Sequence, residues 1–220
     1  MPKKFVLLLS GGGLFLAFIL FSYLVHKNLF TQFDFDTTVR LQDDVSRRFD
    51  AFFSFLSDVG KFEVMTLVLA AFFAVTRKWL AGLAAFILFG GFHLIELYGK
   101  FFVNHPPPPH FMLRTENIVN FPQFYVSSDF SYPSGHAGRA GFISVILLVF
   151  IINHKKLSRN AKIILCGLII CYDLLMGVSR VYLGEHWSTD VIGGAILGSA
   201  FGLMAGAVLL IEKKKKTKNQ

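Results

Sequence analysis

The chain has 220 residues, of which 54% are hydrophobic and only 16% are charged, and its mean hydropathy is +0.55. An ordinary soluble domain carries about 25% charged residues, so this composition excludes a disordered chain and disfavours a soluble enzyme. The net charge of +8 arises from 22 Lys and Arg against 14 Asp and Glu. Because the apolar residues come in long blocks, the sequence is typical of a polytopic membrane protein.

Six apolar blocks approach or exceed the length of about 20 residues that a helix needs to cross a membrane. They cover approximately 5–25, 62–76, 80–99, 136–153, 162–179 and 190–211. The sequence therefore predicts an all-α, six-helix transmembrane bundle that forms one domain over 1–220 and ends in a basic tail at 212–220. The first block is longer than a signal-peptide core and lacks a clear cleavage site, so we expect it to be retained as a span.

The placement of basic residues predicts the orientation in the membrane. If the N-terminus lies inside, four short inside segments hold 13 of the 22 basic residues and only one of the 14 acidic residues, Glu212. This is the positive-inside pattern. We therefore expect a multi-pass protein of the cell membrane with both termini cytoplasmic. We expect the basic tail to act as a topology anchor, with contact to anionic lipid as an additional role, and no nucleic-acid partner is needed to explain it.

Three outside segments then remain, at 26–61, 100–135 and 180–189, and they hold most of the polar residues. The first is mixed in charge and contains an amphipathic stretch near 45–56 that we expect to lie at the membrane interface. The second is a long loop with a proline-rich start, and long loops are often functional.

The last apolar block contains four glycines at intervals of four residues: Gly194, Gly198, Gly202 and Gly206. They form one smooth helix face that permits close approach of a second backbone. We expect this face to pack within the bundle rather than against a second copy of the chain.

The string Tyr132-Pro133-Ser134-Gly135-His136 stands where the fourth span begins. Proline fits a first helical turn, and the N–H groups of that turn have no helical partners. A helix N-terminus with Ser and Gly is suited to bind phosphate. Ser134 and Gly135 are therefore candidate phosphate-binding residues, and His136 is placed beside the anion.

A second polar group, at 179–190, precedes the last span. His186 and Asp190 are four residues apart, so they share a helix face if the span begins near His186. An Asp behind a His fixes its tautomer and stabilises the charge that it acquires. Arg180 ends the fifth span and can donate two hydrogen bonds to phosphate oxygens.

The two polar groups, at 132–136 and 179–190, both resemble motifs of a known family. Pro133-Ser134-Gly135-His136 and Ser179-Arg180-x5-His186-x3-Asp190 resemble the second and third signature motifs of the type 2 phosphatidic acid phosphatase family, with every polar identity in order and at the right spacing. These are integral-membrane lipid phosphate phosphatases, related to soluble vanadium haloperoxidases. Six spans with the polar groups outside agree with the membrane architecture of that family.

The first family motif is Lys, six residues, then Arg-Pro, and this chain departs from it. Lys100 and Pro108 match, but Pro107 stands where the arginine is expected, which removes one phosphate donor. Three nearby cationic or titratable residues are candidates for compensation, with Arg139 preferred among them: Arg139, Arg114 and His105. Arg139 lies three residues after His136 and so on the same helix face.

The resemblance implies a two-step phosphoryl transfer through a phosphohistidine, and the residue types fit it. Neutral His186 is expected to attack phosphorus, oriented by Asp190, while His136 serves as general acid and then general base. Lys100, Ser134, Gly135 and Arg180 are expected to bind the phosphate oxygens, with Arg139 as a further candidate. No cofactor and no metal are expected, and the requirement for one neutral and one charged histidine predicts a bell-shaped pH profile.

The predicted enzyme is a phosphatase of phospholipid metabolism with an extracytoplasmic site, and its partners are the bilayer and a lipid phosphate. The sequence leaves the lipid open among polyprenyl pyrophosphate, phosphatidylglycerol phosphate, phosphatidic acid and lipid A phosphate, and it names no protein partner. A lipid phosphotransferase that uses the same phosphohistidine is an alternative. A non-catalytic lipid-binding or transport protein is another, supported by Pro107.

Intramembrane polar residues form a last group. His93 and Glu96 share a face near the outer end of the third span, and Glu96 lies one turn before Lys100. Asp173 lies in the fifth span, about two turns before Arg180. We expect these residues to position Lys100 and Arg180 through pairing rather than to act in catalysis.

Overall fold

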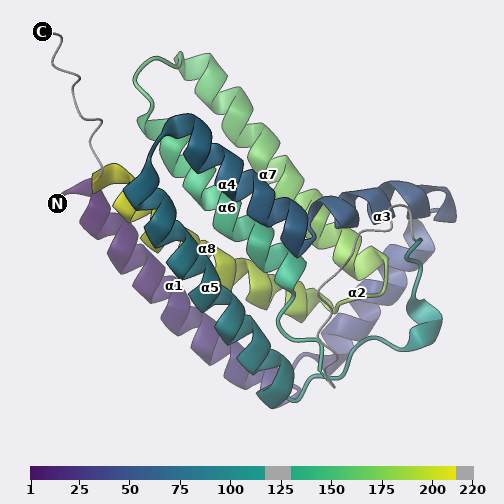
Figure 1. Ribbon diagram of the computed structural model, residues 1–220. Coiled ribbons are helices and arrows are strands. Elements are labelled where there is room, and N and C mark those ends of the chain that lie inside the picture. The colour runs from purple at the N-terminus through teal and green to yellow at the C-terminus, as the bar shows by residue number, and fades with distance from the viewer. Residues whose placement is uncertain (117–129, 212–220) are drawn as a thin grey trace, which may run out of the picture.

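Figure 1 shows the computed structural model, which describes residues 1–116 and 130–211. The described chain contains eight α-helices and two short 3₁₀ turns, and the predicted all-α class is confirmed. In chain order they are α1 (Lys3–His26), α2 (Thr31–Asp44), η1 (Arg47–Phe49), α3 (Asp50–Val59), α4 (Phe62–Thr76), α5 (Trp79–Phe102), η2 (His110–Met112), α6 (Gly135–Asn153), α7 (Arg159–Tyr182) and α8 (Ser188–Ile211). The predicted tail at 212–220 lies outside the described residues.

Each of the six apolar blocks forms a helix, but only five of the described helices are long and apolar enough to cross a membrane alone: α1, α5, α6, α7 and α8. The predicted second block forms α4, which has 15 residues. It reaches the length of a span only together with the preceding segment Arg47–Val59, from which it is bent by 52°. The described residues therefore give five spans, or six if this bent pair is one span.

The core forms where α8 packs against α1, α5 and α6 (Figure 1). Large apolar side chains from these helices are fully buried there, among them Phe92, Phe142, Ile146 and Leu197. The outward faces carry exposed leucines instead, including Leu9, Leu16, Leu20, Leu83, Leu168 and Leu174. An apolar exterior around an apolar core is what a bundle surrounded by lipid requires.

The glycine face of α8 packs within the bundle, as predicted, and its partner there is α6. A side-chain carbon at Gly198 would collide with the backbone of Gly138, and one at Gly194 would collide with the carbonyl of Ser134. This close approach sets the two helix starts beside each other, and the Ser134 N–H donates to the carbonyl oxygen of Asp190 at 2.9 Å. The glycines thereby bring together the two polar groups that the sequence singled out.

Gly198→Ala is expected to lower the thermal stability of the detergent-purified protein, because the added carbon must push α6 and α8 apart at a backbone contact. Overpacking of this kind costs about 1–3 kcal/mol. Gly13→Ala on α1 is the matched control, since a carbon there meets nothing within 4 Å and alanine favours a helix over glycine. Thermal denaturation of both variants decides the matter, and equal melting temperatures would contradict the packing described.

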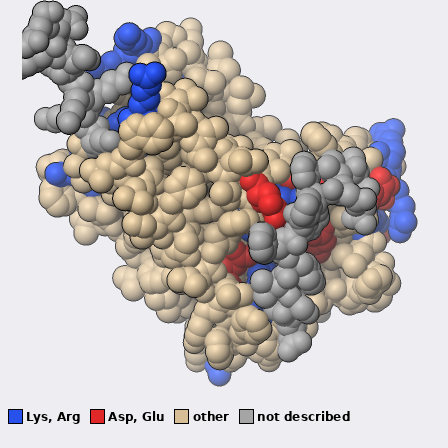
Figure 2. Space-filling model, viewed as in Figure 1, with Lys and Arg blue, Asp and Glu red and all other residues tan. Residues whose placement is uncertain are grey.

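Basic segments gather at one end of the bundle. Lys3 Nζ donates to Asn153 Oδ1 at 2.9 Å, which joins the start of α1 to the end of α6. Lys78 Nζ donates to the carbonyl oxygen of Leu209 at 3.1 Å, which joins the turn before α5 to the end of α8. Lys and Arg side chains accordingly show at the upper left in Figure 2, and a second group shows at the right of that view. In Figure 1, α2 and α3 lie at the opposite end of the molecule.

The outer segment 26–61 is mostly helical: it forms α2 and α3, which cover the end of the bundle, and the amphipathic stretch near 45–56 falls largely in η1 and α3. Its location at the membrane interface stays a prediction. The structure corrects two local expectations. Pro133 lies before the first turn of α6 rather than in it, since the helix begins at Gly135 with Ser134 as N-cap. Asp173 does not pair with Arg180. It faces α6 and accepts a hydrogen bond from Ser144 Oγ at 2.7 Å.

Candidate active site

The His186–Asp190 pair forms where α8 begins. His186 Nδ1 lies 3.2 Å from Asp190 Oδ2, and both side chains are buried. The same oxygen accepts the backbone N–H of Trp187 at 3.0 Å, as in a capping box in which the acidic residue of the first turn bonds the N-cap N–H. The helix start thus fixes the carboxylate, and the carboxylate leaves Nε2 as the ring nitrogen of His186 that is available to a ligand.

Burial controls the protonation of His186. Removal from water lowers the pKa of its imidazole, and this outweighs the opposing effect of the hydrogen bond to Asp190, so that the pKa falls from 6.5 to about 4. The ring is therefore neutral at pH 7, which is the state in which a histidine nitrogen is nucleophilic.

The start of α6 supplies the second part of the site. Ser134 is the N-cap, but its hydroxyl makes no cap hydrogen bond. Ser134 Oγ and His136 Nε2 are both buried, and neither has a hydrogen-bond partner within the described parts of the chain. A side chain at Gly135 would collide with Glu96 and Arg139. Buried polar atoms without partners are uncommon, and here two of them lie at one helix N-terminus, where an anion binds favourably.

Arg180 lies at the end of α7 and is completely buried. One terminal nitrogen of its guanidinium donates to Ser57 Oγ of α3, and the other pairs with the carboxylate of Glu185. Its Nε atom has no partner among residues 1–116 and 130–211. The sequence predicted Arg180 as a phosphate ligand but gave no sign of Ser57 or Glu185 beside it.

Lys100 is half-buried near the end of α5 and lies within electrostatic range of Glu96, Asp190 and Arg180. His136 in turn interacts electrostatically with Arg180, Arg139, His186 and Lys100. The structure therefore brings all the predicted site residues into one cluster at the end of the bundle that α2 and α3 cover. A concentration of positive charge in a site of low exposure favours a phosphate.

The three candidates for replacing the missing arginine are placed differently. Arg139 donates from Nε to the Gly60 carbonyl at 3.0 Å, and its Nη1 lies 3.9 Å from Glu96 Oε2. Glu96 is also hydrogen-bonded to His93 Nδ1 at 2.9 Å, on the helix face that the sequence predicted these two residues to share. Arg139 lies against Gly135, and of the three it alone adjoins the start of α6.

Arg114 and His105 face other partners. Arg114 donates to the carbonyl oxygen of Gln42 at 2.9 Å and stacks over the ring of Tyr182, so it joins the loop to α2 and α7. His105 is buried and its Nδ1 lies 2.8 Å from Asp190 Oδ1, on the side of the carboxylate away from His186. Pro107 itself is exposed.

Sequence comparisons place the chain in a known family. The profile of the PAP2 superfamily matches residues 78–214, which include both polar groups and Lys100. The chain belongs to the PAP2 superfamily. It is 31% identical to phosphatidylglycerophosphatase B of Bacillus subtilis over 138 residues, 61% of each protein. It is 39% identical to an undecaprenyl-diphosphatase of Sulfolobus acidocaldarius over 90 residues, 40% of this chain and 38% of that protein. The chain thus spans less than two thirds of the curated relatives that it matches.

The fold has a solved counterpart. The crystal structure of a transmembrane PAP2-type phosphatidylglycerolphosphate phosphatase from Bacillus subtilis superposes with a TM-score of 0.69 at 24% sequence identity. The match covers 94% of this chain and 98% of the other. This likeness supports the membrane bundle described above.

Proposed function

We propose that this PAP2 superfamily member is a membrane phosphatase that hydrolyses lipid phosphates or pyrophosphates through a phosphohistidine. The observation that carries the proposal is the neutral, Asp190-held His186 within a cluster of buried, partly unpartnered polar groups, including Ser134 Oγ, His136 Nε2 and Arg180 Nε. A phosphate bound there would give these atoms the partners that they lack.

In the first step, His186 Nε2 attacks phosphorus and the bond from phosphorus to the leaving oxygen breaks. His136 donates a proton to that oxygen. Lys100, Arg180, Ser134 and the N–H groups at Gly135 hold the other phosphate oxygens, with Arg139 as a further contributor. Such preorganised positive charge supplies most of the rate enhancement in phosphoryl transfer.

In the second step, water attacks the phosphohistidine and the N–P bond breaks. His136 accepts the proton from water, and phosphate leaves with His186 restored to its neutral form. Asp190 stabilises the positive charge on the His186 ring while phosphorus is attached. No metal ion takes part in either step, because cationic side chains neutralise the phosphate.

We also propose that the site faces the extracytoplasmic side and that both termini are cytoplasmic. The basic segments at the opposite end of the bundle support this orientation under the positive-inside rule. The substrate headgroup would then enter from the end covered by α2 and α3. An apolar cavity of about 290 Å³ between α4, α6 and α7 includes Ala140, one turn after His136, and offers space for part of a lipid chain.

Phosphate release tests the proposal. Purified protein in EDTA is offered short-chain phosphatidic acid, phosphatidylglycerol phosphate, polyprenyl pyrophosphate and a lipid A phosphate, with His186→Ala as the blank. Release of inorganic phosphate from at least one lipid by the wild type alone is expected. Transfer of the phosphate to a second lipid, with no free phosphate and no turnover without that acceptor, would indicate the phosphotransferase instead. Binding of these lipids with no release by folded protein would favour a non-catalytic binder, with Pro107 as the first residue to replace by arginine.

A further inference from the structure

Both carboxylate oxygens of Asp190 have a histidine partner. Oδ2 faces His186 Nδ1 at 3.2 Å, and Oδ1 faces His105 Nδ1 at 2.8 Å. Asp190 is completely buried and His105 nearly so. An orienting carboxylate that is held on both sides cannot rotate away from the histidine that it orients.

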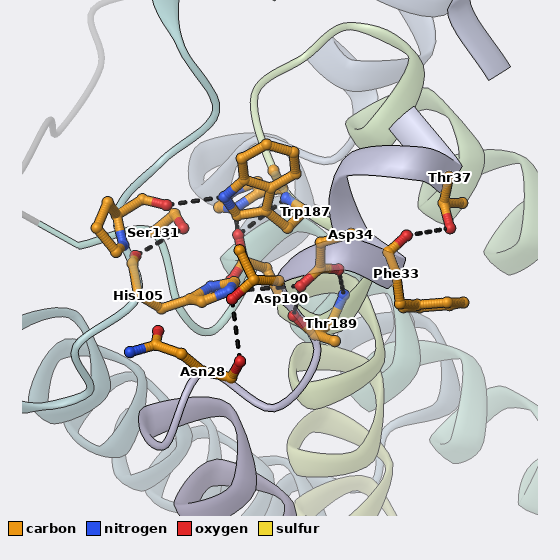
Figure 3. Close-up of polar contacts among 12 residues, drawn as sticks. Asn28, Phe33, Asp34, Thr37, His105, Ser131, Trp187, Thr189 and Asp190 are labelled. Carbon is orange, nitrogen blue, oxygen red and sulfur yellow. Dashed lines mark hydrogen bonds and ion pairs between the residues drawn. The ribbon is translucent and has the colours of Figure 1, made fainter. Parts of the chain in front are cut away.

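His105 is held in turn by a second carboxylate. Its Nε2 lies 3.4 Å from Asp34 Oδ2 of α2. Asp34 is buried and accepts hydrogen bonds from the N–H of Thr189 at 2.8 Å and from Thr189 Oγ1 at 2.7 Å. Figure 3 shows Asp34, His105 and Asp190 gathered beside Thr189 at the start of α8. Four side chains therefore follow one another as His186, Asp190, His105 and Asp34.

The geometry makes His105 an imidazolium. Each of its nitrogens faces a carboxylate oxygen, and an ionised carboxylate only accepts hydrogen bonds, so both nitrogens must donate. Burial would lower the pKa of His105, but the hydrogen bonds to Asp190 and Asp34 outweigh burial and raise the pKa to about 9. His105 thus stays charged at pH values where His186 is neutral.

The loop fixes His105 independently of these contacts. Its carbonyl oxygen accepts the Ser131 N–H at 3.0 Å and the Ser131 hydroxyl at 3.1 Å. Trp187 Nε1 donates to the carbonyl of Pro106 at 2.8 Å. In the described chain, one more titratable side chain lies against His105 besides the two carboxylates. It is Tyr132, whose ring packs edge-on against the His105 ring. Burial raises the pKa of its phenol, so it stays neutral.

We propose that His105, held by Asp34, is a positioning residue that orients Asp190 toward His186 and keeps His186 unprotonated; this inference rests on the proposed function. The charge of His105 partly neutralises Asp190, so Asp190 attracts a proton to His186 less strongly. His186 then remains a free nucleophile to lower pH. Lys100 of α5 also interacts electrostatically with Asp190, so its positive charge likewise weakens the attraction of Asp190 for a proton on His186.

The test is the pH dependence of kcat/KM for phosphate release from short-chain phosphatidic acid, in wild type and His105→Gln. Glutamine keeps a donor toward Asp190 but not the charge. Because the reaction needs neutral His186, the rate falls as pH drops through the pKa of His186. Loss of the His105 charge raises that pKa, so the acidic limb is expected to move up by about one pH unit. Substrate ionisation is common to both proteins and cancels in the comparison.

Further variants sharpen the result. Asp34→Asn removes a negative charge while Asp190 still keeps His105 protonated at the low pH of this limb, so the limb is expected to stay or move slightly to lower pH. His105→Asn, which is also neutral, replaces His105→Gln if the latter fails to fold. His105→Lys restores the charge and is expected to return the limb toward wild type. His110→Gln is the matched control, because His110 is exposed in the same loop, and its profile is expected to be unchanged.

A readout without catalysis separates this inference from the proposed function. In histidine-labelled protein, NMR titration reports the pKa of His186 directly, with His186→Gln to assign the signal. A pKa that rises in His105→Gln supports the inference even if the wild type releases no phosphate, an outcome that would overturn only the proposed function. An unchanged pKa and an unmoved acidic limb in folded His105→Gln would overturn the inference.

Discussion

His186→Ala is expected to release phosphate from the preferred lipid at least about 10⁴-fold more slowly than the wild type, the scale seen when a covalent nucleophile is removed. No other described residue presents a neutral imidazole held by a carboxylate next to Arg180, Lys100 and Ser134. The remaining cationic groups would still bind the phosphate, so lipid affinity is expected to change much less than the rate. The loss therefore falls on kcat.

Trapping the intermediate makes this result specific. Wild-type protein mixed with radiolabelled lipid phosphate and denatured in alkali is expected to retain the label, because an N–P bond survives alkali and is cleaved by acid. His186→Ala and His186→Gln are expected to retain none, while His154→Gln, between α6 and α7 at the basic end of the bundle, labels normally. Label retained on His186→Gln would mean that a different residue attacks phosphorus.

Most of the site contacts that could be predicted from the sequence are between residues a few positions apart. His186 and Asp190 meet because they are four residues apart at a helix start, and the spacing alone indicates a shared face. The glycines of α8 indicated a close helix contact in the same way, although the sequence did not identify α6 as the partner. Apolar blocks located the helices, since a span must be long and apolar whatever it packs against.

Contacts between segments far apart in the chain could not be predicted from the sequence. His105 and Asp190 are 85 positions apart, and Asp34 and Thr189 are 155 apart, with no pattern that links either pair. The sequence placed His105 among candidates to bind phosphate, but its ring is directed to carboxylates. Asp34 lies in α2, in a segment that the sequence analysis describes only as mixed in charge. The sequence did not reveal α2 as a helix, because a short helix that covers the end of a bundle has neither the length nor the apolar content of a span. Such tertiary contacts depend on how α2 docks, which a single sequence does not show.

His136→Gln is expected to slow release from a lipid phosphate by about 10³-fold, within the range for loss of a general acid. The lipid leaves as an alkoxide, which needs the proton that His136 supplies. p-Nitrophenolate leaves without that help, so the first step with p-nitrophenyl phosphate is expected to survive in the variant. The second step still lacks its base. The variant should therefore give a burst of one p-nitrophenolate per protein, followed by slow turnover, in stopped-flow absorbance.

Ser134→Ala provides the comparison, because its hydroxyl sits one residue before Gly135 at the same helix start and is buried without a partner among the described residues. Its expected role is to hold a phosphate oxygen, which matters equally for both substrates. Ser134→Ala should therefore slow lipid and aryl phosphate by similar factors and show no burst. If the first step of His136→Gln were slowed equally with both substrates, so that no burst appeared, proton transfer to the leaving group would not be the function of His136. Its position among Arg180, Lys100 and Arg139 would then assign it to phosphate binding.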